Sequence, residues 1–404
     1  MIILVLNCGS SSIKYQLFDT EKHFEVLAKG YIERIGLPMG CITHRYHGEK
    51  YYEEQPIPDH KDGIRIALKA LTHPEIGVIK SFEEIDAVGH RMAHGGEYFR
   101  QSTIVTPEIV EKLHHCIDLA PLHVPGNLTG IAAMQDVLPN VPQVVIFDTA
   151  FHADIPAKAF LYGLPYEYYE KYGIRKYGFH GTSHGYVAEK GAEMLNRANR
   201  NGRTWKDMKI ISCHLGSGSS IAAIDHGRSL DTTMGMTSLE GLVMGSRVGD
   251  VDAGALVFLA EKEGWNVADL EKVLYKNSGL VGISSGTQDM RDVYAGKLNG
   301  DEKCTNAFDV FAYRVKKTIG AYMAAMNGCD LLILTGGIGE NAWFMRHAIL
   351  ENMEYLGIDV DLELNDKTMG EDCILSRPNS RVAVAAVTTN EELVMAQETL
   401  ALVK

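Results

Sequence analysis

Two stretches of the sequence, about 200 residues apart, decide the fold. Residues 2–19 read IILVLNCGSSSIKYQLFD, and residues 209–225 read KIISCHLGSGSSIAAID. Each contains a short apolar run, a turn of glycine and serine, and a second run that ends in aspartate. Such runs, bounded by glycine and serine, predict two strands joined as a β-hairpin. The repetition of the pattern predicts a duplicated fold with one copy in each half of the chain.

Other parts of the chain alternate between strand-like and helical patterns. The strand-like runs are residues 87–90, 144–148, 331–335 and 382–387. Residues 308–327 are expected to form a helix with one apolar stripe, made of Phe311, Val315, Ile319 and Met323. Residues 390–403 are expected to form a final helix. Strands that alternate with helices indicate an α/β architecture.

Composition excludes several classes of protein. The chain has 404 residues and a formal net charge of −13, which argues against a nucleic-acid binder because phosphate backbones require a basic surface. Its seven cysteines are an odd number without a CxxC pair, which favours a reducing, cytoplasmic location over a disulfide framework. No basic leader precedes the N-terminal apolar run, and no apolar stretch approaches the ~20 residues that cross a bilayer, so neither a signal peptide nor a membrane association is predicted.

Glycine-rich segments end four of the expected strands, at residues 7–12, 94–96, 214–220 and 335–341. Glycine allows backbone amides to approach a phosphate closely, and consecutive amides form an anion-binding nest. The sequence has neither GxxxxGK[ST] nor a GxGxxG after the first strand, so it is neither a Walker-type nucleotidase nor an ordinary dinucleotide binder. Two phosphate-type hairpins and a late turn at 335–341 predict a cleft between two duplicated domains.

Seven motifs together resemble the acetate kinase family, in order and spacing and nearly from end to end. They are NCGSSSIK (7–14), GHRMAHGG (89–96), FDTAFH (147–152), YGFHGTSH (177–184), HLGSGSS (214–220), TGGIGEN (335–341) and TTNEE (388–392). The resemblance implies two duplicated ribonuclease H-like, or actin-like ATPase, domains with a cleft between them. Residues 1–152 are expected to form the first domain, with the helix at 389–404 returning to it, and residues 153–388 the second, nucleotide-binding domain. The implied reaction is reversible, magnesium-dependent transfer of the γ-phosphoryl group of ATP to a short-chain carboxylate, giving an acyl phosphate and ADP.

Four residues are expected to carry this chemistry. Attack of a carboxylate on a phosphoryl group brings two anions together, so the protein must neutralise charge and align the reactants. Arginine suits this task because it is always charged and binds anions with two hydrogen bonds. By resemblance, Arg91 and Arg247 reach the carboxylate and the transferring group, and His180 stabilises the transition state. Asp148 follows an apolar strand, a common active-site position, and organises an arginine or a metal-bound water.

The resemblance also assigns a metal and the phosphates of ATP. Mg²⁺, for which Mn²⁺ could substitute, is expected near Asn7 and Glu391, and Ser10, Ser12 and Lys14 are expected near phosphate. Without the resemblance, Glu391 fits the first turn of a helix capped by Asn390. The other expected nucleotide contacts are His214, Leu215, Gly216, Ser217, Gly218, Asp289, Met290, Arg291, Gly337, Ile338, Gly339, Glu340 and Asn341. Residues 289–291 also match an ordinary exposed loop.

The expected acyl pocket departs from the family pattern. Its walls are assigned to Ala93, Leu122, Phe179 and Met236, and Ala93 stands where acetate kinases usually carry valine. The smaller side chain leaves room for roughly one more carbon, worth about 1–3 kcal/mol of discrimination, so propionate or another short-chain acid is an alternative to acetate. Ser217 replaces a usual asparagine near the expected phosphates, so the sequence does not decide which phosphoryl donor is preferred.

Two further expectations concern assembly and a rival function. A homodimer follows from the resemblance alone. The rival is a non-catalytic nucleotide-binding switch, which would need neither paired arginines nor a carboxylate pocket. The presence of Arg91, Arg247 and His180 together counts against it.

Overall fold

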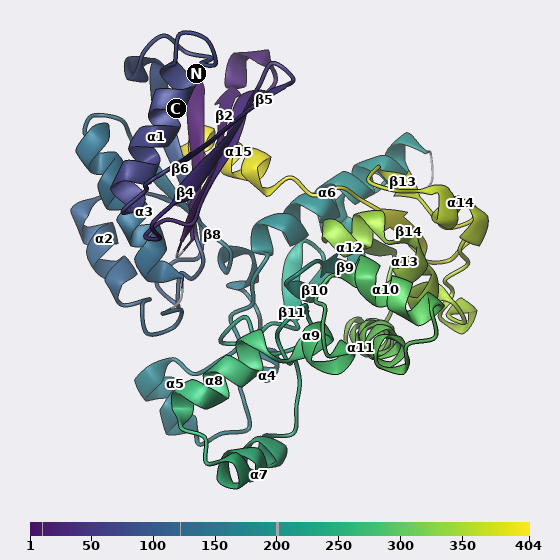
Figure 1. Cartoon of the computed structure of the whole chain (residues 1–404). Helices are drawn as coiled ribbons and strands as arrows, with labels where there is room; N and C mark the ends of the chain where they lie inside the picture. The colour runs from purple at the N-terminus through teal and green to yellow at the C-terminus, as the bar shows by residue number, and fades with distance from the viewer. Residues whose placement is uncertain (10, 122, 199–201) are drawn as a thin grey trace. The chain divides into compact units, whose positions relative to one another are not determined.

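The computed structural model describes residues 1–9, 11–121, 123–198 and 202–404 (Figure 1). Two of the expected site residues, Ser10 and Leu122, therefore lie outside the described residues. The chain divides into two compact units. Unit 1 comprises Met1–Ala150 and Asn390–Lys404, and unit 2 comprises Phe151–Thr389.

Unit 1 is built on an eight-stranded sheet in the order β5-β4-β3-β2-β1-β6-β8-β7. β1 pairs antiparallel with β2 and parallel with β6, which pairs parallel with β8. The strands are β1 (Ile2–Cys8), β2 (Ser12–Asp19), β3 (Glu25–Glu33), β4 (Gly40–Tyr46), β5 (Glu49–Gln55), β6 (Ile85–Met92), β7 (Thr103–Ile104) and β8 (Gln143–Phe147).

Helices pack on both faces of the unit 1 sheet. Alternate side chains of a strand point to opposite faces, and on β1 both sets are apolar. Leu4, Leu6 and Ile13 belong to the core that includes residues of α1 (His60–Thr72) and α3 (Val124–Val137). Ile3 and Val5 lie on the other face, against α15 (Glu391–Val403). A further helix of this unit is α2 (Pro107–His114).

Unit 2 contains a six-stranded sheet in the order β11-β10-β9-β12-β14-β13. β9 pairs antiparallel with β10 and parallel with β12, which pairs parallel with β14. The strands are β9 (Lys209–Leu215), β10 (Ser219–Asp225), β11 (Arg228–Thr232), β12 (Leu331–Thr335), β13 (Cys373–Ile374) and β14 (Ala383–Ala386). The predicted duplication is confirmed, because β3-β2-β1-β6-β8 and β11-β10-β9-β12-β14 have the same order and the same pairing directions.

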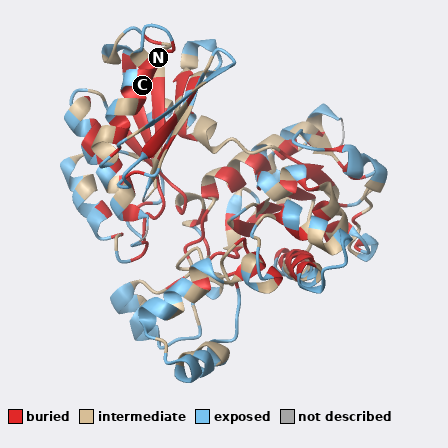
Figure 2. Ribbon diagram, in the orientation of Figure 1, coloured by how far each residue is buried: buried red, intermediate tan, exposed pale blue. Residues whose placement is uncertain are grey.

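Two helices sandwich the unit 2 sheet, whose strands are buried in Figure 2. α6 (Gly181–Arg197) packs on one face, and α11 (Glu302–Met326) packs on the other. The predicted stripe of α11 is confirmed, since all four of its side chains are buried. The remaining helices are α4 (Ala157–Phe160), α5 (Tyr166–Tyr172), α7 (Ala253–Glu263), α8 (Val267–Lys276), α9 (Gly279–Ser284), α10 (Met290–Leu298), α12 (Gly336–Asn341), α13 (Trp343–Leu350) and α14 (Leu362–Lys367).

The prediction of a turn at residues 335–341 was wrong, because Thr335 ends β12 and Gly336–Asn341 form the short helix α12. Gly336 has φ +76°, and a Cβ there would lie 2.7 Å from the carbonyl oxygen of Leu215, so only glycine fits where the chain leaves β12. The helix begins directly after this sharp bend. Among the described residues, no helix is both long enough and apolar enough to cross a membrane.

Candidate active site

An arginine–aspartate pair lies where two parallel strands of unit 1 end. Arg91 is on β6, and Asp148 directly follows the neighbouring β8. The Asp148 carboxylate accepts from Arg91 Nε at 2.9 Å and from Nη2 at 2.6 Å. The negative charge of Asp148 raises the pKa of Arg91. The aspartate is 2% exposed, so it acts as a fixed support for the guanidinium.

The β1–β2 hairpin presents polar side chains next to this pair. Asn7 and Lys14 are directly opposite each other in the register, so their side chains share one face of the sheet. The backbone amide of Gly9 donates to the carbonyl oxygen of Ser12 at 2.8 Å and closes the turn. Lys14 is exposed, while Asn7 and Ser12 are half-buried.

The N-terminus of α15 adds carboxylates to the same unit. The Asn390 side chain accepts from the amide of Leu393, which confirms the predicted cap. Glu391 and Glu392 occupy the first turn, and their charges contribute to the raised pKa of Arg91. No group of three or more His, Cys, Asp or Glu that could hold a metal occurs in the described part of the chain. An amide and a carboxylate, Asn7 and Glu391, nevertheless suit Mg²⁺, which usually keeps several waters and takes only one or two protein ligands beside substrate phosphates.

The expected acyl-pocket residues lie in both units. Ala93 is buried in unit 1, and its amide donates to Asn127 Oδ1 at 3.1 Å. Phe179 is buried in unit 2 in a small cluster with Met234 and Met244. Met236 is half-buried, and its amide donates to the hydroxyl of Tyr162 at 3.0 Å.

His180 stands at the entrance to α6 and is held by a chain of hydrogen bonds. Its backbone has φ 57°, in the left-handed region. Ser220 Oγ lies 2.8 Å from His180 Nδ1 and 2.8 Å from His184 Nε2. Because a serine hydroxyl carries one proton, it donates to only one of these rings and accepts from the other. Burial lowers the pKa of His184 well below its usual value, so His184 is neutral. The tautomers of the His180 and His184 rings are therefore linked through the Ser220 hydroxyl.

Arg247 is a partly buried cation for which the described residues supply no carboxylate. Its Nη1 donates to the carbonyl oxygen of Ser238 at 3.2 Å and lies 3.7 Å from the sulfur of Met244. Burial lowers the pKa of this guanidinium. A charge held in this way costs desolvation energy, which an anionic ligand would offset.

Three features of unit 2 converge on the turn between β9 and β10. A Cβ built on Gly218 would lie 3.4 Å from Arg247 Nη1 and 3.5 Å from His180 Nε2. The ring of His214 stacks on that of His180, with 4.3 Å between centroids. The amide of Gly245 donates to the carbonyl oxygen of Ser217 at 3.1 Å and ties the Arg247 loop to the same turn. The structure thus brings together four predicted residues: His180, His214, Gly218 and Arg247.

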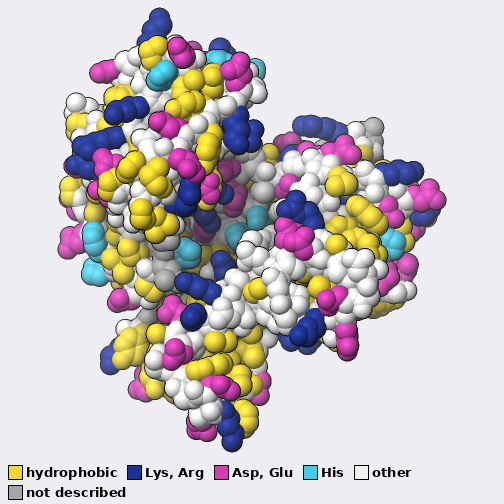
Figure 3. Space-filling model, in the orientation of Figure 1, with side chains coloured by type: hydrophobic (Ala, Val, Ile, Leu, Met, Phe, Trp, Pro, Cys, Tyr) yellow, Lys and Arg dark blue, Asp and Glu magenta, His cyan; other side chains and the backbone are white. Residues whose placement is uncertain are grey.

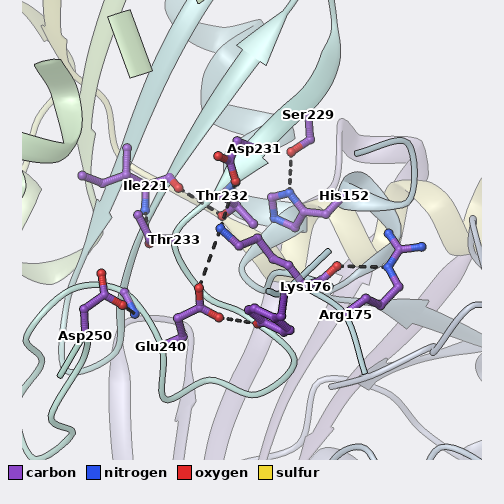
Figure 4. A network of polar contacts seen from close by, with 12 residues as sticks. His152, Arg175, Lys176, Ile221, Ser229, Asp231, Thr232, Thr233, Glu240 and Asp250 are labelled. Carbon is purple, nitrogen blue, oxygen red and sulfur yellow. Dashed lines mark hydrogen bonds and ion pairs between the residues drawn. The ribbon is translucent and has the colours of Figure 1, made fainter. Parts of the chain in front are cut away.

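A polar network anchors the loop that carries Arg247 (Figure 4). Lys176 Nζ lies 3.0 Å from Asp231 Oδ1 and 3.8 Å from Glu240 Oε1. The Tyr162 hydroxyl donates to the other oxygen of Glu240. Burial raises the pKa of Glu240.

The same loop is bonded to the segment that leads to His180. The carbonyl oxygen of Gly235 accepts from the amides of Tyr177 and Gly178, each at 3.1 Å. Since Lys176 precedes these residues, it connects the His180 segment to the Arg247 loop. None of the sequence motifs indicated this role, because the partners are far apart in the chain.

Unit 2 also contains a pocket of about 650 Å³ that joins three of the predicted nucleotide segments. Its lining is Gly216, Ser217, Gln288, Asp289, Met290, Arg291, Gly337, Ile338, Asn341, Ala342, Trp343, Phe344 and Met369. Asp289 caps α10 and forms an ion pair with Arg291. The sequence did not indicate Gln288, Trp343, Phe344 or Met369, although the two adjacent aromatic residues after the glycine-rich segment were an available signal.

Six predicted nucleotide residues lie outside this lining. Lys14 belongs to unit 1, and His214 and Gly218 lie at the turn between β9 and β10; the others are Leu215, Gly339 and Glu340. Leu215 is fully buried in the core, and Gly339 is buried against β12. The carboxylate of Glu340 accepts from the backbone amides of Gly336 and Thr389, both at 3.0 Å. Glu340 therefore ties β12 to the segment that precedes α15.

Two glycine-rich hairpins, the arginines Arg91 and Arg247 and a nucleotide-sized pocket are features typical of a phosphotransferase that acts on a small anion. Comparisons agree: the model of the acetokinase family matches residues 2–397. The acetate kinase of Parabacteroides distasonis is 50% identical over 402 residues, covering 99% of this chain and 98% of that protein. The crystal structure of Porphyromonas gingivalis acetate kinase has a TM-score of 0.95 and 44% identity and covers 100% of both chains. A propionate kinase from Francisella tularensis has a TM-score of 0.91 and 38% identity and covers 99% of both chains.

The chain belongs to the acetokinase family. It is accordingly a kinase, and ATP is its expected phosphoryl donor. The relatives at about 50% identity are acetate kinases, so the alternative of a propionate kinase, raised by Ala93, is not favoured.

Proposed function

We propose that this chain transfers the γ-phosphoryl group of ATP to acetate in a reversible, magnesium-dependent reaction. The observation that carries the proposal is Arg247, a partly buried guanidinium without a carboxylate partner among the described residues, whose Nη1 converges with His180 Nε2 on the glycine of a phosphate-type turn. A site of this kind suits a transferring phosphoryl group, whose charge must be stabilised as it moves.

We assign each residue one task in direct, in-line transfer. Arg91, oriented by Asp148, binds the acetate carboxylate through the edge that Asp148 leaves open. Arg247 and His180 donate hydrogen bonds to the phosphoryl oxygens. Acetate is already ionised at neutral pH, so the reaction needs no general base, and Asp148 acts as a positioning residue.

We assign the nucleotide to the unit 2 pocket and its metal to unit 1. Trp343, Phe344 and Met290 give the pocket an apolar wall suited to a base, and Gly337 offers a backbone amide to a phosphate. Asn7 and Glu391 would hold Mg²⁺ through water, and Mn²⁺ would substitute. The ion would supply charge neutralisation on the ATP phosphates.

The test of this function is an assay with hydroxylamine, which traps acyl phosphates, using ATP, Mg²⁺ and either acetate, propionate, butyrate or isobutyrate. We expect acetate to give the highest kcat/KM. A larger acid in first place would contradict the assignment of acetate, and the absence of any hydroxamate would contradict the kinase mechanism.

We further propose that the chain is a cytoplasmic homodimer. All seven cysteines are free thiols, as a reducing compartment requires. α5, α7 and α8 expose large apolar side chains, among them Tyr166, Val257, Phe258 and Val267 (Figures 2 and 3). An exposed apolar surface of this kind typically marks a protein interface. Light scattering should give twice the mass of the chain, and Phe258→Asp should give a monomer.

A further inference from the structure

One face of the antiparallel half of the unit 1 sheet carries basic side chains that are open to solvent, next to a row that contains Glu33 and Glu54. α1 contacts β2, β3 and β4 from the face that carries the core residues Ile13, Ile32 and Ile42. α15 lies over the opposite face at β1, β6, β7 and β8. On that second face, Lys14, Lys29 and Arg45 are exposed, and Gln16, Tyr31 and Thr43 are half-buried.

The strand register places like charges directly opposite one another. Lys29 on β3 pairs with Arg45 on β4, which pairs with Lys50 on β5. Lys14 is opposite Tyr31 in the adjacent row, and its Nζ lies 5.5 Å from the centroid of that ring. Like charges directly opposite on neighbouring strands are destabilising. This arrangement is unfavourable unless an anion is present, and it occurs in a chain whose net charge is −13.

A pocket of about 370 Å³ opens between these side chains. Its lining contains three cations, Lys14, Lys29 and Arg45, and one carboxylate, Glu392, for a net charge of +2 (three minus one). Within the described part of the chain, no ion pair engages any of the three cations. The pocket is therefore a positively charged recess made by strands, separate from the site residues Arg91 and Asp148, and it shares Lys14 and Asn7 with the proposed phosphate and metal site.

We propose that this pocket binds a small polyanion with two or more linked phosphate groups and that the bound anion inhibits the enzyme. Strands lie about 4.7–4.9 Å apart and diagonal neighbours about 7–8 Å apart, so Lys14, Lys29 and Arg45 match anionic groups spaced over a chain of two or three phosphates. Arg45 can hold one phosphate with two hydrogen bonds, and the lysines act as point charges. The inhibitory effect rests on the proposed function, because an anion that engages Lys14 withdraws it from the phosphates of ATP.

The test measures binding of tripolyphosphate to the nucleotide-free full chain by calorimetry, without Mg²⁺. The variant Lys29→Ala/Arg45→Ala removes two cations that have no part in the proposed reaction. Its matched control is Arg65→Ala/Lys69→Ala, on α1 of the same unit. We expect the first variant to weaken the Kd for tripolyphosphate at least tenfold and to keep the KM for ATP within twofold of the parent. The control should bind like the parent, and the parent should be inhibited competitively with ATP.

Two results would overturn the inference. Unchanged binding in Lys29→Ala/Arg45→Ala would mean that the anion occupies the nucleotide pocket instead. Equal affinity for citrate would show that the pocket does not select phosphate. Because binding is measured without turnover, these results are independent of the kinase assay: a chain that forms no hydroxamate but loses tripolyphosphate binding in the first variant would refute the proposed function and retain the pocket.

Discussion

Replacing Asp148 by asparagine should show how far activity depends on the way Asp148 holds Arg91, because the charge of Arg91 itself stays in place. The carboxylate accepts two hydrogen bonds from the guanidinium, at 2.9 and 2.6 Å, in the fork geometry that holds an arginine most firmly. Asparagine has the same shape but offers one oxygen and one NH₂ group. Asp148→Asn therefore keeps one hydrogen bond, turns the other into a contact between donors, and removes the compensating charge.

The size of the effect follows from burial. A hydrogen bond to a charged group contributes about 1.5–3 kcal/mol, and breaking a buried ion pair costs about 3–5 kcal/mol. The Arg91 side chain is 31% exposed, so water can solvate part of its charge, and we expect the lower end, about 3 kcal/mol of unfolding free energy. A reacting group displaced by about 1 Å loses about 10²-fold in rate. We therefore expect kcat for acetyl phosphate formation to fall about 100-fold.

The assay is steady-state kinetics with hydroxylamine trapping, together with urea unfolding to confirm that the variant is folded at the assay temperature. Arg203 and Asp330 provide a matched pair, since Asp330 also accepts two hydrogen bonds from one guanidinium, at 3.0 and 3.2 Å, but precedes β12 instead of following a strand. Asp330→Asn should leave kcat within twofold. If Asp148→Asn retained more than a third of the parent kcat, Asp148 would not be the residue that positions Arg91.

Three further outcomes test other parts of the structure. Arg247→Lys keeps the charge but loses the planar fork, so kcat should fall at least 100-fold at an unchanged KM for ATP; a smaller loss than tenfold would contradict its role. Glu240→Gln weakens the anchor of the Arg247 loop, so kcat should fall about tenfold while KM for ATP stays constant, whereas the exposed control Glu263→Gln should have no effect. Burial lowers the pKa of His90 from 6.5 to about 4. As pH falls below about 6.5, His90 therefore takes up a proton in the unfolded chain before it does so in the folded one. The free energy of unfolding decreases as a result, by about 2 kcal/mol at pH 5. Urea unfolding of His90→Gln should lose less stability between pH 7.5 and 5 than the parent, and equal losses would contradict the shift.

The parts of the fold that the sequence predicted have strong local patterns. Both hairpins, the apolar strands and the stripe of α11 depend on residues close together in the chain, and all are present. The strands β4 and β5 were not predicted, because β5 (EKYYEEQ) carries charged and aromatic side chains without apolar alternation. β4 pairs with β3 and β5 pairs with β4, and no local pattern encodes this pairing.

The candidate site likewise contains residues that the sequence indicated and contacts that it did not. Motifs located the arginines, His180 and the phosphate-type turns, since each belongs to a short stretch with distinctive glycines. The contacts that support these residues could not be predicted from the sequence. Lys176 and Glu240 are far apart in the chain, and the residues around each of them give no sign that the two form an ion pair. Ser220 was visible as part of a turn, but its bridging position between two histidines depends on how α6 packs against β10.

The position of α15 has a consequence for the order in which the chain matures during synthesis. Unit 1 is assembled from both ends of the polypeptide, and α15 supplies Met395 and Ala396 to the core over β1, β6 and β8. Unit 2 is complete in sequence by Thr389, whereas unit 1 must wait, with one face of its central strands uncovered, although it is made first. The N-terminal half is thus the later part to finish folding, and it is the part that a nascent-chain chaperone would need to shield.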